Sequence, residues 1–159
     1  MLLSSGLVLT ALVVFADAKP QLGYNTYNDI WCSPNATYLS STINALVSKG
    51  FFAAGYNIFQ IDCGWSSTDL QRDSAGALKI DPVNFPAGLA PISQQARNAG
   101  LAFGLYGDAG VRACDTTSPS QRLGSLGHEA ADAQLFKNLG VTFLKCEQAS
   151  SRRLNISLY

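Results

Sequence analysis

A carboxylate and two aromatic side chains flank an apolar segment early in the chain. Asp62 ends this segment inside the string Gln-Ile-Asp-Cys-Gly-Trp at residues 60–65. A carboxylate in that place can accept two adjacent sugar hydroxyls, while an aromatic ring such as Trp65 or Tyr27 can cover the apolar face of a pyranose. The same string fits an Asp that caps a turn beside a packed Trp. Both interpretations stay open on the string alone.

A second group of ionisable residues stands later in the chain. Lys145 and Glu147 alternate with Leu144 and Cys146, so in a strand both would point to the same side and meet as an ion pair. A lysine there would hold the neighbouring carboxylate ionised and bind a hydroxyl group. An ordinary surface pair at the end of a strand explains the same spacing.

Several other chemistries are excluded by the residues that they require. His128 is the single histidine, and the four cysteines form no Cys-x-x-Cys pair, so we expect no metal site. The chain has no Gly-x-Ser-x-Gly string and no glycine loop for phosphates. We therefore expect no metal, no cofactor and no serine nucleophile.

The charge balance excludes two classes of partner. Eleven Lys and Arg residues cancel eleven Asp and Glu residues, and charged residues make up 14% of the chain, against roughly 25% in ordinary soluble domains. Without a basic field we expect neither a nucleic-acid partner nor a membrane partner. The expected ligand is neutral and bound by local contacts.

A structural unit recurs three times in the sequence, and polar candidate residues stand at its C-terminal end. Each copy has an amphipathic helix, a glycine, a short apolar strand and a polar end. The glycines Gly55, Gly100 and Gly140 suit the left-handed position that ends a helix, and they precede predicted strands at 56–61, 101–106 and 141–145. The helices are predicted from apolar residues at helical spacing: Leu39, Ile43, Leu46 and Val47, then Leu89, Ile92 and Ala96, then Ala131, Leu135, Phe136 and Leu139.

Alternating strands and helices predict an α/β fold with a parallel sheet. With residues 21–25 as a first strand, the four strands and three helices fit either a small doubly wound sheet or half of a (β/α)₈ barrel. Barrel active sites form where the strands end, and this favours the barrel because polar residues gather there: Tyr27, Asp62, Tyr106, Asp108, Lys145 and Glu147. A complete TIM barrel needs about 250 residues, so we expect one truncated to about its first four βα units.

The first 18 residues are predicted to be a signal peptide. They form an apolar run shorter than the roughly 20 residues of a membrane span, and they end in Ala-Asp-Ala before Lys19. The four cysteines and two glycosylation acceptors, Asn35 and Asn155, fit an oxidising secretory route. We therefore expect a secreted, extracellular protein.

Five strings in order resemble the melibiase-type glycoside hydrolases, which comprise α-galactosidases and α-N-acetylgalactosaminidases. The strings are Leu-Gly-Tyr-Asn-Thr-Tyr-Asn at 22–28, Gln-Ile-Asp-Cys-Gly-Trp at 60–65, Phe-Pro-Ala-Gly at 85–88 with the glycine-rich strand at 100–110, Gly-Ser-Leu-Gly-His-Glu at 124–129 with Asp132 and Ala133, and Gly-Val-Thr-Phe-Leu-Lys at 140–145. The resemblance implies a (β/α)₈ barrel that hydrolyses terminal α-galactosyl residues of oligosaccharides with retention of configuration. Two carboxyl groups about 5 to 5.5 Å apart perform such a reaction.

Carried over by position, the resemblance implies a role for each predicted site residue. Asp62 would bind galactose hydroxyls, Tyr27 and Tyr106 would shape the pocket, and Lys145 would bind a hydroxyl beside the nucleophile. Glu147 stands at the nucleophile's place, where the family has Asp. A Glu reaches one methylene farther, and near-attack geometry is sensitive to about 1 Å.

The cysteines follow the family pattern only in part. Cys32 and Cys63 resemble a family disulfide, and Cys63 also stands where many members carry a second sugar-binding Asp. Cys114 would pair with a cysteine two residues past the nucleophile, where this chain has Ala149.

The resemblance runs from about residue 22 to Lys145. We therefore expect residues 19–145 to be the N-terminal half of a glycoside hydrolase barrel and residues 146–159 to be translated intron or frameshifted sequence. On this interpretation the acid/base carboxylate is absent from the chain. The alternative to an active enzyme is a catalytically inactive fragment that at most binds a sugar or a partner.

Overall fold

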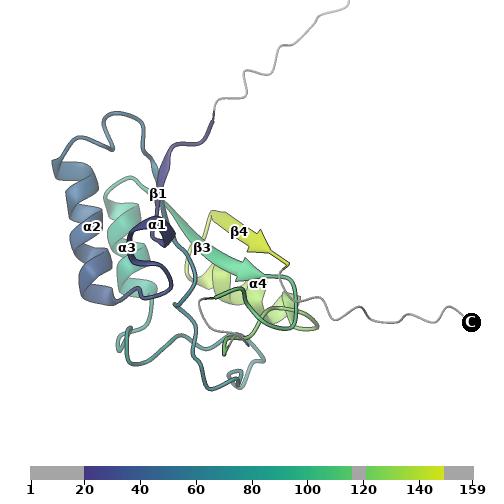
Figure 1. Cartoon of the computed structure of the whole chain (residues 1–159). Helices are drawn as coiled ribbons and strands as arrows, with labels where there is room; N and C mark the ends of the chain where they lie inside the picture. Colours follow the sequence, from purple (N-terminus) through teal and green to yellow (C-terminus); the bar gives the residue numbers. More distant parts are fainter. Residues whose placement is uncertain (1–19, 116–120, 149–159) are drawn as a thin grey trace, which may run out of the picture.

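The computed structural model describes residues 20–115 and 121–148. The four predicted strands alternate with the three predicted helices, and a short helix that was not predicted follows the first strand (Figure 1). They are β1 (Gly23–Asn25), α1 (Tyr27–Ile30), α2 (Ala36–Ser48), β2 (Ile58–Ile61), α3 (Ala90–Asn98), β3 (Ala102–Asp108), α4 (Glu129–Asn138) and β4 (Phe143–Glu147). The predicted signal peptide at 1–18, the acceptor Asn155 and most of the tail at 146–159 lie outside the described residues.

The four strands form one parallel sheet in the order β1-β2-β3-β4. Each strand lies beside the one that follows it in the chain, as in the first units of a (β/α)₈ barrel. A doubly wound sheet instead reverses its strand order at a switch point. The sheet order therefore favours the barrel over the other predicted architecture.

The core lies between the sheet and the helices. Phe59 and Ile61 on β2 and Phe103 and Leu105 on β3 are completely buried, because alternate residues of a strand point to the same face. The helices meet them with one apolar stripe each, through Leu39, Ile43, Leu46, Ile92, Ala96 and Phe136. Figure 1 shows α2 and α3 side by side along this face.

The helices differ from prediction in two details. Val47 is exposed, because the stripe of α2 that meets the sheet consists of Leu39, Ile43 and Leu46. Gly55 lies in the turn before β2, whereas Gly50 is the glycine just past α2. Gly100 and Gly140 follow α3 and α4 with φ of 83° and 70°, so the predicted left-handed helix ends are present there.

The edge strands also differ from prediction. β1 begins at Gly23 instead of residue 21, and β4 continues through Cys146 to Glu147. The long strand β3 explains the extension, since Asp108 pairs with Glu147 and the Ala109 N–H donates to the Glu147 carbonyl at 2.7 Å. Residues 146 and 147, which follow the last residue of the family resemblance, therefore belong to the strand.

Asn35 and His128, which the sequence marked as a glycosylation acceptor and as the single histidine, are the N-cap residues of α2 and α4. Asn35 caps α2, since its Oδ1 accepts the Tyr38 N–H at 2.9 Å. Its side chain is exposed, and its glycosylation stays a prediction. None of the helices in the described ranges has the length and apolar character of a membrane span.

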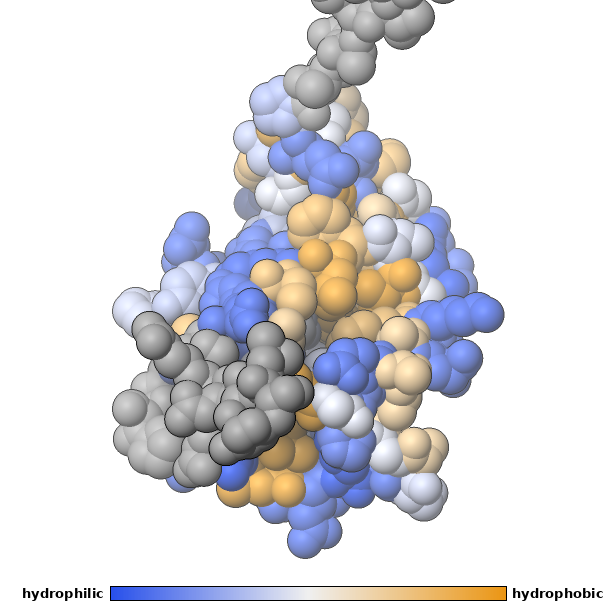
Figure 2. All heavy atoms as spheres, turned by 90° about the vertical axis from the view of Figure 1, so that its right-hand side faces the viewer, coloured by the Kyte–Doolittle hydropathy of each residue, from blue (hydrophilic) through white to orange (hydrophobic). Residues whose placement is uncertain are grey.

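Exposed apolar residues gather on one side of the molecule. β4 and α4 lie on the right in Figure 1, and the view from that side shows an apolar band between hydrophilic residues (Figure 2). Leu144 on β4 is 44% exposed. Within the described residues, β1 pairs only with β2 and β4 pairs only with β3. Both edges of the sheet are therefore open there.

Candidate active site

The carboxyl ends of the strands surround a pocket of about 180 Å³. Five predicted site residues line it, and Cys114 and Asp115 complete the lining. The five are Tyr27, Asp62, Tyr106, Lys145 and Glu147. They come from positions up to 120 residues apart in the sequence, and the parallel sheet brings them together because all strand ends meet at one edge.

Lys145 contacts most of the other polar groups of this pocket. Its Nζ is 2.9 Å from Asp62 Oδ2 and 3.0 Å from Glu147 Oε1. The same atom lies 5.4 Å from the ring centroids of both Tyr27 and Tyr106. The predicted ion pair with Glu147 is therefore present, and it also includes Asp62 and two aromatic rings, which attract a cation through their faces.

Opposing effects act on the pKa of Lys145. Burial by itself lowers this pKa, because desolvation disfavours the ammonium form. The Asp62 and Glu147 carboxylates outweigh burial and raise the pKa above its ordinary value. The side chain therefore stays cationic at physiological pH. An ammonium group at hydrogen-bond distance from two carboxylates offsets part of their negative charge, and of its three N–H groups it keeps one for a ligand.

Asp62 is held from several directions and is only 1% exposed. Its backbone N–H donates to the Thr26 hydroxyl at 2.9 Å, and its Oδ1 accepts the Cys63 N–H at 2.9 Å. Its Oδ2 accepts from Asn25 Nδ2 at 2.9 Å as well as from Lys145. Asp62 therefore lies beneath Lys145, and in this structure Lys145 and Glu147 present the more accessible polar atoms.

Of the two aromatic residues considered for the sugar face, only Tyr27 lines the pocket. Tyr27 is 41% exposed. Trp65 is buried, packs edge-on against Phe136, and donates its indole N–H to the Tyr106 carbonyl at 2.9 Å. Trp65 therefore belongs to the core, as the alternative interpretation of residues 60–65 expected.

Tyr106 fixes the loop that follows β3. Its hydroxyl accepts the Cys114 N–H at 2.8 Å and lies 3.1 Å from the Cys114 carbonyl oxygen, to which it can donate. Burial is the main reason why the pKa of Tyr106 is raised, and the charges of Asp108 and Glu147 add to the effect. The tyrosine therefore stays neutral and orders one wall of the pocket.

Three residues near the site were not predicted as part of it. Cys114 lines the pocket with a free thiol, whose pKa is raised by burial and then by Glu147. Asp115 has no exposed side-chain surface and pairs with Arg122 at 3.3 Å. Asn25 contacts Asp62 from β1. Asp115 and Arg122 lie in loops without periodicity, so no sequence signal marks them.

Cys63 lies outside this pocket. The structure joins it to Cys32 in the predicted disulfide, which ties the loop after α1 to the end of β2. Its sulfur is buried and bonded, and Cys63 faces a different pocket together with Trp65 and Ala113. The structure therefore supports its place in the disulfide and gives it no contact with the Lys145 pocket.

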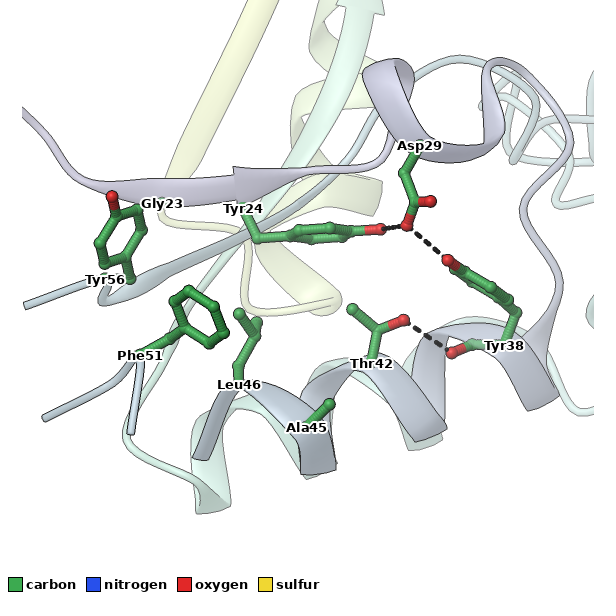
Figure 3. A pocket seen from close by; sticks show the side chains of 9 residues that line it. All are labelled: Gly23, Tyr24, Asp29, Tyr38, Thr42, Ala45, Leu46, Phe51 and Tyr56. Carbon is green, nitrogen blue, oxygen red and sulfur yellow. Dashed lines mark hydrogen bonds between the residues drawn. The ribbon is translucent and has the colours of Figure 1, made fainter. Parts of the chain in front are cut away.

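A larger pocket of about 370 Å³ lies between β1 and α2 (Figure 3). Leu46, Phe51 and Ala45 form its apolar wall, and at one end Asp29 Oδ2 accepts the hydroxyls of Tyr24, at 2.6 Å, and Tyr38. It lies on the helix side of the sheet, because Tyr24 stacks on the core residue Phe59. None of the predicted site residues lines it.

Groups of three His, Cys, Asp or Glu side chains that could hold a metal ion are absent from residues 20–115 and 121–148. The residues that could contact a ligand in the Lys145 pocket are an ammonium, carboxylates, phenol rings and a thiol. This combination can hold a polyhydroxylated ring by hydrogen bonds at its edge and aromatic contact at its face.

The model of the Alpha galactosidase A family, a melibiase family, matches residues 28–156. The chain belongs to this family. The matched range covers α2 to β4 and four of the five predicted residues of the Lys145 pocket, and the fifth, Tyr27, directly precedes it. It also continues past Lys145, where the motifs found in the sequence end.

Curated relatives agree with this family. Alpha-galactosidase 2 from Arabidopsis thaliana is 37% identical over 151 residues, which are 95% of this chain and 34% of the relative. Alpha-galactosidase from Coffea arabica is 35% identical over 154 residues, 97% of this chain and 37% of the relative. The chain therefore spans about a third of the length of these relatives.

Solved structures agree with the barrel. Alpha-galactosidase I from Mortierella vinacea is 32% identical with a TM-score of 0.74, covering 82% of this chain and 31% of that one. The Saccharomyces cerevisiae α-galactosidase solved with raffinose is 33% identical with a TM-score of 0.73, covering 82% and 27%. The predicted fold class, a TIM barrel represented by its first four βα units, is confirmed.

Proposed function

We propose that this chain supplies part of the active site of a secreted α-galactosidase, which hydrolyses terminal non-reducing α-D-galactosyl residues of oligosaccharides with retention of configuration. The observation that carries the proposal is the convergence of the Asp62 and Glu147 carboxylates on Lys145, whose ammonium also lies near the rings of Tyr27 and Tyr106. This arrangement lies at the carboxyl ends of the strands, where barrel enzymes form their active sites. The family to which the chain belongs includes α-galactosidases.

Each group has a defined task in the proposed reaction. Tyr27 and Tyr106 bracket the sugar, and Lys145 donates a hydrogen bond to a hydroxyl while it compensates the charge of Glu147. Glu147 attacks the anomeric carbon, and a second carboxyl group about 5 to 5.5 Å away protonates the leaving oxygen and then activates water. We expect that second group from the part of the relatives' length that this chain does not span.

The first experiment measures release of nitrophenol from nitrophenyl α-D-galactoside by the purified 159-residue chain, with Glu147→Gln as the control. Turnover that the substitution abolishes supports the proposal. Proton NMR of the product then tests retention, since a retaining enzyme releases the α-anomer first.

A binding measurement distinguishes the proposed enzyme from the alternative, an inactive fragment that binds a sugar. Raffinose is the probe for titration calorimetry, and Lys145→Met is the comparison because it removes the ammonium from the pocket. Because the second carboxyl group is expected outside this chain, binding without turnover supports the sugar site and assigns the isolated chain to the alternative, a fragment that binds a sugar without hydrolysing it. If the chain neither binds raffinose nor hydrolyses the nitrophenyl galactoside, the proposed sugar site is overturned.

Secretion is tested separately. The run at 1–18 ends in Ala-Asp-Ala, so after expression in a secreting host we expect the culture medium to contain a protein that begins at Lys19. N-terminal sequencing checks the cleavage site. Retention of the uncleaved protein inside the cells would contradict this part of the proposal.

A further inference from the structure

We propose that Asn25 is a positioning residue for the sugar site and sets the direction of the Asp62 carboxylate and of Tyr27. Asn25 ends β1 and pairs in register with Gln60 on β2. Its side chain therefore lies on the same face of the sheet as the Lys145 pocket, beneath the residues that we expect to contact the sugar. This inference rests on the proposed function.

The side chain of Asn25 makes three hydrogen bonds, and both of its N–H groups are used. Its Oδ1 accepts the backbone N–H of Tyr27 at 2.8 Å. Its Nδ2 donates to Gln60 Oε1 at 3.0 Å and to Asp62 Oδ2 at 2.9 Å. The reverse orientation of the amide would place its oxygen against two acceptors and its nitrogen against a donor, so only one orientation satisfies these neighbours.

These bonds connect both parts of the site. The Tyr27 N–H starts the short helix that carries the exposed ring, and that ring lies 5.4 Å from Lys145 Nζ. Asp62 Oδ2 receives Asn25 on one side and Lys145 on the other. Without the amide, Lys145 would be the only remaining side-chain donor to this carboxylate among the contacts described above, and the ammonium could follow the carboxylate out of place.

The buried side chain of Gln60 also depends on Asn25 for a hydrogen bond. Gln60 is 5% exposed, and its Nε2 is buried without a hydrogen-bond partner in the described part of the chain. Its Oε1 is satisfied by Asn25. Loss of the Asn25 amide would therefore leave both polar atoms of this side chain without a partner among the described contacts, and a buried polar group without a partner is costly.

Two substitutions separate positioning from folding. Asn25→Leu has nearly the same shape and removes every side-chain hydrogen bond, so it should weaken binding of methyl α-D-galactoside by at least about tenfold at any pH, the scale of one hydrogen bond to a charged group. Asn25→Asp keeps the shape but places a second carboxylate beside Asp62 Oδ2. Asn98→Asp, on the exposed end of α3, adds the same charge elsewhere and is the matched control.

The pH dependence of Asn25→Asp gives the decisive readout. Two carboxylates in contact share a proton as the pH falls, and the protonated form then donates to Asp62 as the amide did. Affinity relative to wild type should therefore be low at about pH 8 and recover towards about pH 5. The other titratable groups around the pocket are Lys145 and Glu147 on β4, Tyr106 on β3, Tyr27 on α1, and Cys114 and Asp115 in the loop after β3. The comparison with wild type at each pH accounts for their own titration, because these groups are the same in both proteins.

Titration calorimetry with methyl α-D-galactoside measures affinity. The chemical shift of the side-chain ¹H–¹⁵N resonance of Lys145 reports the hydrogen bonds and charges around its ammonium group. If wild type does not bind the galactoside, the proposed function fails, and the Lys145 resonance alone decides the positioning role. That resonance should shift in both Asn25 variants and stay unchanged in Asn98→Asp. Wild-type affinity without pH dependence in Asn25→Asp, or an unshifted resonance, would overturn the inference even if Asn25→Leu failed to fold.

Discussion

Lys145 compensates a carboxylate that is almost completely buried. In Lys145→Met, Asp62 keeps only the N–H groups of Asn25 and Cys63 as donors to its side chain among the contacts described above. We expect the free energy of unfolding in urea to fall by about 1–3 kcal/mol. The matched control is Lys79→Met, since Lys79 pairs with the exposed Asp69, and its stability should be nearly unchanged. Equal losses in both variants would contradict the role of burial.

The raised pKa of Tyr106 predicts that the free energy of unfolding falls at alkaline pH. Burial raises its pKa in the folded state above the ordinary value of about 10, so the folded protein holds this proton more tightly than the unfolded chain. The resulting stabilisation is fully present below pH 10 and is lost as the pH rises through the folded pKa. Urea unfolding between about pH 9 and 11 should show a decline that is shallower in Tyr106→Phe. Tyr56→Phe removes the hydroxyl of an exposed tyrosine and is the control for loss of a phenol group.

At the scale of elements, Asp132 joins α4 to the long connection between β2 and α3. It is 1% exposed, and its Oδ1 accepts from Arg72 Nη1 and from the Leu78 N–H, both at 2.8 Å. The sequence placed Asp132 in a family string without assigning it a task. Asp132 and Phe136 are the two buried residues of α4, so one of the two buried side chains of this helix is held by hydrogen bonds instead of apolar contact.

Removing this contact should be costly. Asp132→Ala leaves the Arg72 guanidinium buried with only the carbonyls of Gly76 and Gly124 among the acceptors described here. We expect the free energy of unfolding to fall by about 3 kcal/mol or more, measured by urea denaturation. Gln134→Ala removes an exposed side chain of the same helix and should cost far less. A small effect of Asp132→Ala would show that α4 is held by its apolar contacts alone.

At the scale of the whole molecule, the open edges of the sheet predict self-association. Unpaired strand edges are templates for pairing with another chain, and Leu144 adds exposed apolar surface at the β4 edge. Sedimentation velocity of the purified 159-residue chain should show larger species as the concentration rises, and Leu144→Lys should reduce them. Val83→Lys changes a residue that is 84% exposed in a loop and should have no effect. Monomers at all concentrations would contradict the prediction.

The apolar and glycine patterns of the sequence determined the order of helices and strands and the parallel sheet, because burial of one face imposes its period on the chain. The polar residues at the strand ends favoured the barrel over a doubly wound sheet. The ordered strings also identified the family, the disulfide and five residues of the pocket. Tertiary structure alone decided that Trp65 is a core residue, that Asp62 lies beneath Lys145, and that Asn25, Cys114 and Asp115 adjoin the site. These contacts join residues far apart in the chain, and their geometry depends on how the strand ends and loops meet, which no local pattern encodes.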